Sequence, residues 1–234
     1  MQLPAYAELH CLSNFSFLRG ASHPEELVVQ AAAQGYAALA LTDECSLAGV
    51  VRAHQAVQTL RQQLIETHGQ AVGEQKAPRL LIGSEMTTVD GLKLVFLAKN
   101  REAYGNLSAL ITLARRRAAK GAYTLQRHDL NVVSPNGAVP DCLVLWLPDE
   151  TPSVADGRWL AERFPGRTWL AAELHAGPDD GARLESLQAL GAACGLPLVA
   201  AGDVHMHARS RRPVQDVLTA LRLKYLDQEI VLEG

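Results

Sequence analysis

Four short polar clusters in this sequence each follow a run of apolar residues and carry side chains that bind divalent cations in proteins. Imidazole nitrogens and carboxylate oxygens suit zinc and manganese-type ions. If each apolar run is a strand, the clusters lie at strand ends, where an α/β barrel places its functional groups. The pattern therefore predicts one polar site at one mouth of a barrel. The candidate ligands are His10, Glu44, Glu85, Asp203 and His205.

Short apolar segments alternate with helical patterns, which is typical of a mostly parallel α/β sheet. Ser22 is predicted to cap the first helix, with Glu25 completing a capping box and Gly35 ending the helix. We expect a polar surface loop at Thr67–Pro78 and a final helix that ends near Leu223. Helices are expected at about 22–34, 46–66, 100–117, 154–163, 179–194 and 213–223, and strands at Tyr6–His10, Ala37–Leu41, Arg79–Gly83, Leu92–Leu97, Cys142–Leu147, Trp169–Glu173 and Leu196–Ala201.

Composition describes an ordinary globular protein. Of 234 residues, 48% are hydrophobic and 20% charged, and the net charge of −3 excludes a global basic field that would attract nucleic acid. The four cysteines are spread along the chain without a C-x-x-C pair, which favours reduced thiols. No basic segment precedes an apolar stretch at the N-terminus, and no apolar run approaches the ~20 residues of a membrane span. We expect a cytoplasmic protein with one domain at 1–222 and a divergent or truncated tail at 223–234.

Several motifs together resemble a known family. They are Leu9-His-Cys-Leu-Ser-Asn-Phe-Ser-Phe-Leu-Arg-Gly-Ala, Ala40-Leu-Thr-Asp, Leu81-Ile-Gly-Ser-Glu, Leu97-Ala-Lys-Asn-Arg-Glu-Ala-Tyr-Gly-Asn-Leu and Leu196-Pro-Leu-Val-Ala-Ala-Gly-Asp-Val-His. In this order they resemble a PHP (polymerase and histidinol phosphatase) domain, of the kind at the N-terminus of error-prone homologues of the bacterial DNA polymerase III alpha subunit. The resemblance implies a distorted (β/α)7 barrel. In active members it also implies a cluster of zinc or manganese-type ions that hydrolyses phosphate esters.

The match to an active site is partial. Where active members have His-x-His, this chain has His10 followed two residues later by Leu12, and Arg19 stands where the family has Asp. Glu44 replaces a His, and Lys93 stands in the place of a His ligand. The strand that ends at Leu147 leads into Pro148, without the Cys or His that the resemblance implies nearby. Since ammonium and guanidinium groups have no lone pair for a metal, we expect Arg19 and Lys93 to pair with Glu44, Glu85 or Asp203 in the former metal pocket.

Other polar residues allow two readings. Asp43, Glu173 and His175 are candidates for support around the metal site, although a polar strand end is the simpler interpretation. His207 is either a spare ligand or a solvated loop histidine. The tract Arg115–Lys120 either contacts DNA phosphates in a parent polymerase or is a solvated helix end.

The resemblance implies that this segment is a structural domain of an error-prone DNA polymerase. DNA repair by translesion synthesis, a nucleotidyltransferase reaction used in DNA replication past damage, would belong to the parent enzyme. Expected partners are the polymerase domains of the same chain, DNA through that chain, accessory mutagenesis proteins and the sliding clamp, with no membrane. We expect one weakly held divalent ion (Zn, Mn or Mg) at most. The alternative is a metal-dependent phosphoesterase, either a 3′–5′ exonuclease or a small phosphatase.

Overall fold

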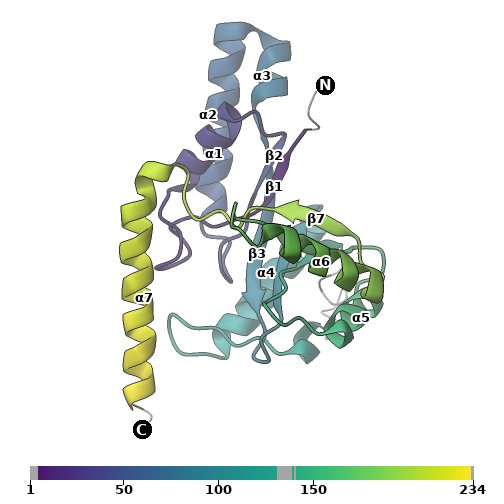
Figure 1. Cartoon of the computed structure of the whole chain (residues 1–234). Coiled ribbons are helices and arrows are strands. Elements are labelled where there is room, and N and C mark those ends of the chain that lie inside the picture. Colours follow the sequence, from purple (N-terminus) through teal and green to yellow (C-terminus); the bar gives the residue numbers. More distant parts are fainter. Residues whose placement is uncertain (1–4, 131–138, 140, 233–234) are drawn as a thin grey trace. The chain divides into compact units, whose positions relative to one another are not determined.

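The computed structural model describes residues 5–130, 139 and 141–232, with side chains through residue 224. Seven strands follow one another in the sheet in chain order, β1 to β7. The chain divides into two compact units. Unit 1 comprises residues 1–43, 48–80 and 203–234, and unit 2 comprises 44–47 and 81–202. Figure 1 labels α1 to α7 and the strands β1, β2, β3 and β7.

Unit 1 contains two parallel strands, β1 (Ala7–Cys11) and β2 (Ala38–Leu41). Helices α1 (Pro24–Ala33) and α2 (Val50–His68) pack against each other, and α2 pairs with α3 (Gln70–Lys76). The third segment of this unit holds the short helix η2 (Arg209–Arg211) and the long helix α7 (Arg212–Leu232). All four residues of β2 are buried, as its continuously apolar sequence predicts.

The first helix begins one residue later than the sequence predicts. Its N-cap is His23, whose backbone N–H donates to Glu26 Oε2 at 2.9 Å. The prediction of Ser22 and Glu25 as the capping box is therefore wrong. The Ser22 hydroxyl instead contacts His207. Its oxygen lies 2.8 Å from His207 Nδ1 and accepts the His207 backbone N–H at 2.9 Å. The contact with His207 therefore takes the place of the predicted cap by Ser22.

The predicted loop at Thr67–Pro78 is also wrong, because α2 runs to His68 and α3 occupies Gln70–Lys76. Gly69 separates the two helices with φ of +87°, a value that glycine adopts without steric cost. Gln70 and Glu74 are hydrogen-bonded side chain to side chain one turn apart. Gly73 lies so close to Ile65 that a Cβ there would be 2.3 Å from Cγ1. The segment is polar because it is an exposed helix.

Unit 2 holds five strands: β3 (Arg79–Thr87), β4 (Lys93–Ala98), β5 (Cys142–Trp146), β6 (Thr168–Glu173) and β7 (Leu198–Ala201). The first two residues of β3 belong to unit 1, and the strand belongs to unit 2 from Leu81 onward. The pairs β3–β4 and β4–β5 are antiparallel, and β5, β6 and β7 run parallel. Helices α4 (Arg101–Arg116), α5 (Val154–Arg163) and α6 (Asp180–Cys194), with the short helix η1 (Arg127–Leu130), complete the unit.

The core of unit 2 is apolar and aromatic. Phe96 from β4 and Phe164 after α5 are fully buried and pack edge to face with centroids 6.3 Å apart. Asn100 caps α4, its side chain accepting the Ala103 N–H at 2.8 Å. Gly195 ends α6 in the left-handed conformation, which glycine adopts readily. This core fixes the strands that carry the unit's polar side chains.

Two element lengths differ from expectation. Strand β3 extends to Thr87 rather than ending at Gly83, because the antiparallel partner β4 continues the ladder from Ile82 to Thr87. The final helix does not end near Leu223 but continues to Leu232. The last two residues of the predicted tail lie outside the described residues.

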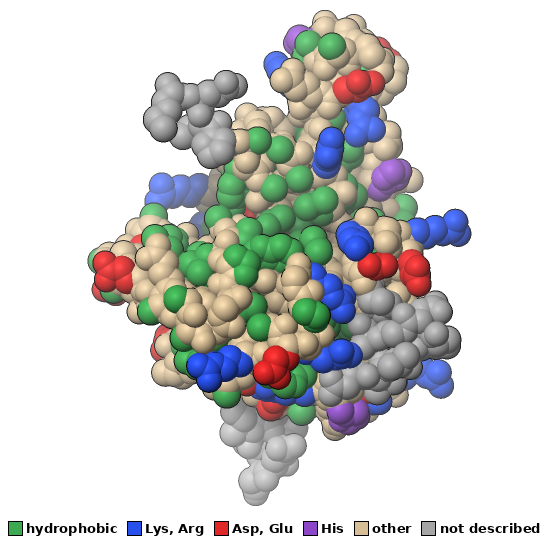
Figure 2. All heavy atoms as spheres, turned by 90° about the vertical axis from the view of Figure 1, so that its right-hand side faces the viewer, with side chains coloured by type: hydrophobic (Ala, Val, Ile, Leu, Met, Phe, Trp, Pro, Cys, Tyr) green, Lys and Arg blue, Asp and Glu red, His purple; other side chains and the backbone are tan. Residues whose placement is uncertain are grey.

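On the face shown in Figure 2, Lys and Arg side chains are interspersed with Asp and Glu and do not form a continuous basic surface. All four cysteines are free and buried. Burial raises the pKa of the Cys142 thiol to about 12 and that of Cys45 to about 11. Within the described part of the chain, no helix combines the length and apolar character required to cross a membrane.

Candidate functional site

His10 is placed by an irregularity in β1. One extra residue of β1 lies between the pairs Glu8–Leu39 and Cys11–Leu41, which is a β-bulge. The His10 N–H donates to the Glu8 carboxylate at 2.9 Å, and the His10 side chain is fully buried. Bulges redirect side chains at functional sites, and this one sets the direction of a buried imidazole.

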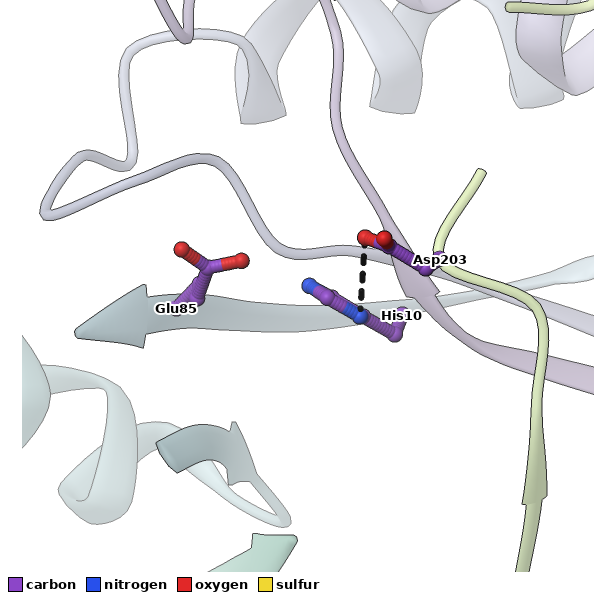
Figure 3. A group of neighbouring side chains, drawn as sticks. All are labelled: His10, Glu85 and Asp203. Atoms are coloured by element: carbon purple, nitrogen blue, oxygen red, sulfur yellow. Dashed lines mark ion pairs between the residues drawn. The ribbon is translucent and has the colours of Figure 1, made fainter. Parts of the chain in front are cut away.

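Asp203 and His205 meet His10 within unit 1. Asp203 Oδ1 lies 3.4 Å from His10 Nδ1 and 3.1 Å from His205 Nε2, so one carboxylate oxygen faces two imidazoles. Figure 3 shows the His10–Asp203 ion pair. The Val204 N–H donates to the His10 carbonyl at 2.9 Å, and Asp203 has φ of +47°. We call His10, Asp203 and His205 the histidine cluster.

Glu85 and Lys93 form an ion pair in unit 2. Lys93 Nζ lies 3.2 Å from Glu85 Oε2, which is one of the pairings expected from the sequence. The Glu85 side chain is 1% exposed and that of Lys93 is 32% exposed. Glu85 was expected directly after a strand, but it lies inside β3, and Lys93 begins β4. The hairpin brings the two residues together, since Thr87 is the register partner of Lys93.

Glu44 belongs to the same unit through a short bridge to β3. Glu44 pairs with Glu85 as an isolated parallel bridge, and Tyr123 donates its hydroxyl to Glu44 Oε1 at 3.2 Å. Burial, followed by the Glu44 charge, raises the pKa of Tyr123 to about 12. The Arg115 guanidinium donates to the backbone carbonyls of Glu44 and Cys45 at 3.1 Å each. Sequence reasoning missed Tyr123 because no local pattern links it to Glu44.

Leu12 and Arg19 occupy two positions where the resemblance implies a metal ligand. Leu12 is fully buried, and its N–H donates to the Val204 carbonyl at 2.8 Å. Arg19 is 8% exposed, and its charge lowers the pKa of Asp43 against the effect of burial. Pairing of Arg19 with Glu44, Glu85 or Asp203 stays a prediction. Neither side chain offers a lone pair to a cation.

Asp43 organises the turn that follows β1. It accepts the Ser13 N–H, the Ser13 hydroxyl and the Ser16 hydroxyl, each at 2.8 Å. Burial dominates and raises the pKa of this carboxyl despite these hydrogen bonds. Gly20 closes the turn, because a Cβ at this position would lie 2.0 Å from the Ser13 carbonyl oxygen.

The remaining polar candidates lie in different environments. Glu173 is the half-buried last residue of β6, and His175 is exposed in the loop that follows. His207 is engaged with Ser22, as described above, and Nδ1 also lies 3.7 Å from Glu26 Oε2. It is therefore part of a hydrogen-bonded contact within unit 1 rather than a solvated loop histidine.

Two members of the basic tract Arg115–Lys120, which begins in the last turn of α4, have internal partners. Arg115 donates to the carbonyls of Gly121 and Ala122 in addition to those of the Glu44 segment. Arg117 holds both oxygens of Asp129 at 2.6 Å, and this contact lowers the pKa of Asp129 against the effect of burial. These contacts weaken the interpretation of the whole tract as a phosphate-binding surface. Arg115 and Arg117 bind carbonyl and carboxylate groups of unit 2 itself.

The histidine cluster alone offers fewer donors than the multi-ion cluster that the resemblance implies for active members of the family. The histidine cluster supplies two imidazoles and one carboxylate, which is enough for a single cation. The carboxylate of Glu85 is paired with an ammonium group, and Leu12 supplies no donor. Two adjacent ions need more ligands than the histidine cluster alone provides.

A profile of the PHP domain matches residues 8–135. The error-prone DNA polymerase of Dechloromonas aromatica is 70% identical over 224 residues, which is 96% of this chain and 20% of the relative. That of an Azoarcus species is 59% identical over 232 residues, 95% of this chain and 22% of the relative. The chain thus spans about a fifth of the length of the curated relatives it matches.

Solved structures confirm the predicted fold class. An amidohydrolase from Chromobacterium violaceum has a TM-score of 0.52 at 14% identity, covering 86% of this chain and 88% of its own. A lesion-specific endonuclease from Pyrococcus furiosus has a TM-score of 0.52 at 11% identity, covering 87% of this chain and 49% of its own. The fold is an α/β fold of the distorted (β/α)7 barrel type. With more than half of its length matched by the family profile, the chain belongs to the PHP domain family.

Proposed function

We propose that this chain is the PHP domain of an error-prone DNA polymerase, in which it has a structural role and does not hydrolyse phosphate esters. The names of its relatives and the fifth of their length that it covers support the placement in a polymerase. Translesion synthesis during DNA repair would take place in the remainder of the parent chain. DNA, accessory mutagenesis proteins and the sliding clamp would be partners of that whole chain, in the cytoplasm.

The Lys93–Glu85 ion pair carries the proposal. A buried carboxylate strongly favours a bound cation or a positive side chain beside it. Here the positive group is an ammonium at 3.2 Å, at a position where the resemblance implies a histidine ligand. We infer that Lys93 takes over the charge-neutralising role of an ion. Leu12, buried where another histidine is expected, replaces a ligand by an apolar contact.

The proposal treats the histidine cluster and Glu85 as parts of the single polar site that the sequence pattern predicts. It is tested by the divalent-metal content of the purified chain after exhaustive dialysis. A second sample carries Lys93→His and Leu12→His, which restore two imidazoles. We expect no stoichiometric metal in the unmodified chain and a gain of metal in the double variant. One tightly held ion in the unmodified chain would contradict the proposal.

A metal-dependent phosphoesterase is the second candidate. It is favoured by the histidine cluster of unit 1, whose two imidazoles and one carboxylate could hold an ion. A bound cation would supply a hydroxide nucleophile at neutral pH and neutralise phosphate charge. This reading predicts that 3′–5′ exonuclease or phosphatase activity depends on added Mn²⁺ and disappears in His10→Ala. Absence of such activity in the unmodified chain supports the structural role.

A further inference from the structure

Helix α7 has an apolar stripe on its exposed side. Val214, Val217 and Leu221 are spaced by three and four residues, so they lie along one face of the helix. Their exposed fractions are 43%, 59% and 42%. A stripe of this kind in a globular protein ordinarily faces a hydrophobic core. In α7 it faces away from the residues of its own unit.

The opposite side of α7 is partly covered but mostly polar. Gln215, Leu218, Thr219 and Arg222 are half-buried, and only one of them is apolar. Gln215 Nε2 lies 3.4 Å from His205 Nδ1, which links the helix to the histidine cluster. Gln215 Oε1 and Arg222 Nε are buried atoms that have no hydrogen-bond partner. The orientation of the helix is therefore the reverse of what burial of apolar surface would favour.

Within residues 5–224, where side chains are described, packing does not explain a helix of this length. Among the helices and strands, η2 is the one neighbour with which α7 makes substantial contact. Figure 1 shows α7 as a long helix separate from α1, α2 and α3 of unit 1. Helices in proteins take most of their stability from packing of an amphipathic face. The stripe requires a covering surface that these residues do not provide.

We propose that the stripe of Val214, Val217 and Leu221 docks the polymerase portion of the parent chain. This inference rests on the proposed function. The relatives are about five times as long as this chain, so a covering surface is available within one polypeptide. The stripe contains no charged residue, which favours an apolar protein surface over nucleic-acid phosphates. Docking within one chain also places α7, and through Gln215 the histidine cluster, at the junction with the polymerase portion.

Hydrogen exchange tests this assignment in two contexts, the 234-residue chain and the full-length polymerase that contains it. The amides of residues 214–224 should exchange at least about tenfold more slowly in the full-length protein. The double variant Val217→Glu, Leu221→Glu should lose this protection in the full-length protein and leave the melting temperature of the 234-residue chain unchanged. Val51→Glu is the matched control, since Val51 is 63% exposed on α2 of the same unit. It should retain the protection.

Equal exchange rates of α7 in the two contexts would overturn the inference. A dimer of the 234-residue chain in light scattering that the double variant converts to a monomer would also overturn it, because the occupant would be a second copy. Primer extension separates this failure from failure of the proposed function. A full-length protein that extends primers but leaves α7 unprotected refutes the docking surface alone, whereas one that cannot extend primers refutes the proposed function as well.

Discussion

Removal of the Lys93 ammonium should destabilise the fold through Glu85. At 3.2 Å and an effective dielectric constant of about 20, two unit charges attract with roughly 5 kcal/mol. Desolvation of the nearly fully buried carboxylate and partial exposure of Lys93 offset much of this energy. A net coupling of about 1–3 kcal/mol is expected, below the range for removing one member of a fully buried pair. For a protein of this length, 2 kcal/mol corresponds to a fall in Tm of roughly 4–8 °C.

A double-mutant cycle measures this coupling directly. Lys93→Met keeps the aliphatic stem without the charge, and Glu85→Gln keeps the shape of the carboxylate without its charge. Urea unfolding of the two single variants, the double variant and the unmodified chain gives the interaction free energy. Each single variant should be less stable than the unmodified chain. The double variant should be more stable than the sum of the two losses predicts.

The matched control is the Arg52–Glu25 pair of unit 1, whose side chains are 45% and 39% exposed. Arg52→Met should cost less than about 1 kcal/mol, because water screens exposed pairs. Additive losses in the Lys93–Glu85 cycle, with a coupling below about 0.5 kcal/mol, would refute the reasoning. In that case Lys93 would not compensate the buried carboxylate, and the main support for a cation-free site would be lost.

Four further predictions concern residues of the two units. Gly20→Ala should lower the free energy of unfolding by about 3 kcal/mol in urea titrations, since its Cβ has no room, whereas Gly105→Ala in α4, where the space is open, should raise it by about 0.5–1 kcal/mol. Burial raises the pKa of Asp43, so the folded state binds this proton more tightly than the unfolded state. As the pH falls from 7 toward 4, the unmodified chain should gain stability relative to Asp43→Asn, and a constant difference would contradict the assignment. With a pKa of about 12, Tyr123 should ionise later than an exposed tyrosine in an absorbance titration, and Cys142 should react with a thiol reagent at pH 8 only after unfolding.

Apolar runs in the sequence located all seven strands, because a buried strand consists mostly of apolar residues. The sequence placed Glu85 just beyond a strand, whereas pairing with β4 extends β3 past it. Strand length in a hairpin depends on the partner, which local composition does not show. The first helix illustrates the same limit. Ser22 has the hydroxyl of a helix cap, but that hydroxyl is hydrogen-bonded to His207, 185 positions away.

At the candidate site, residue types were predictable and their neighbours only in part. Lys93 was expected to pair with a carboxylate because it replaces a metal ligand, and the hairpin supplies Glu85. The bulge that directs His10 depends on the register of β1 against β2, which no motif encodes. The hydrogen bond from Tyr123 to Glu44 spans 79 residues and was not expected. Chemistry can be read from residue types, but long-range contacts require the fold.

The division of the chain has a consequence for the order of folding during synthesis. Unit 2 interrupts unit 1, whose third segment begins only at Asp203. A ribosome releases 81–202 before that segment, and Glu44–Leu47 has by then already emerged. Unit 2 can therefore acquire its complete core while unit 1 still lacks its last segment. Domains released during synthesis commonly fold from the N-terminus onward, but here the interior of the gene encodes the unit that is completed first.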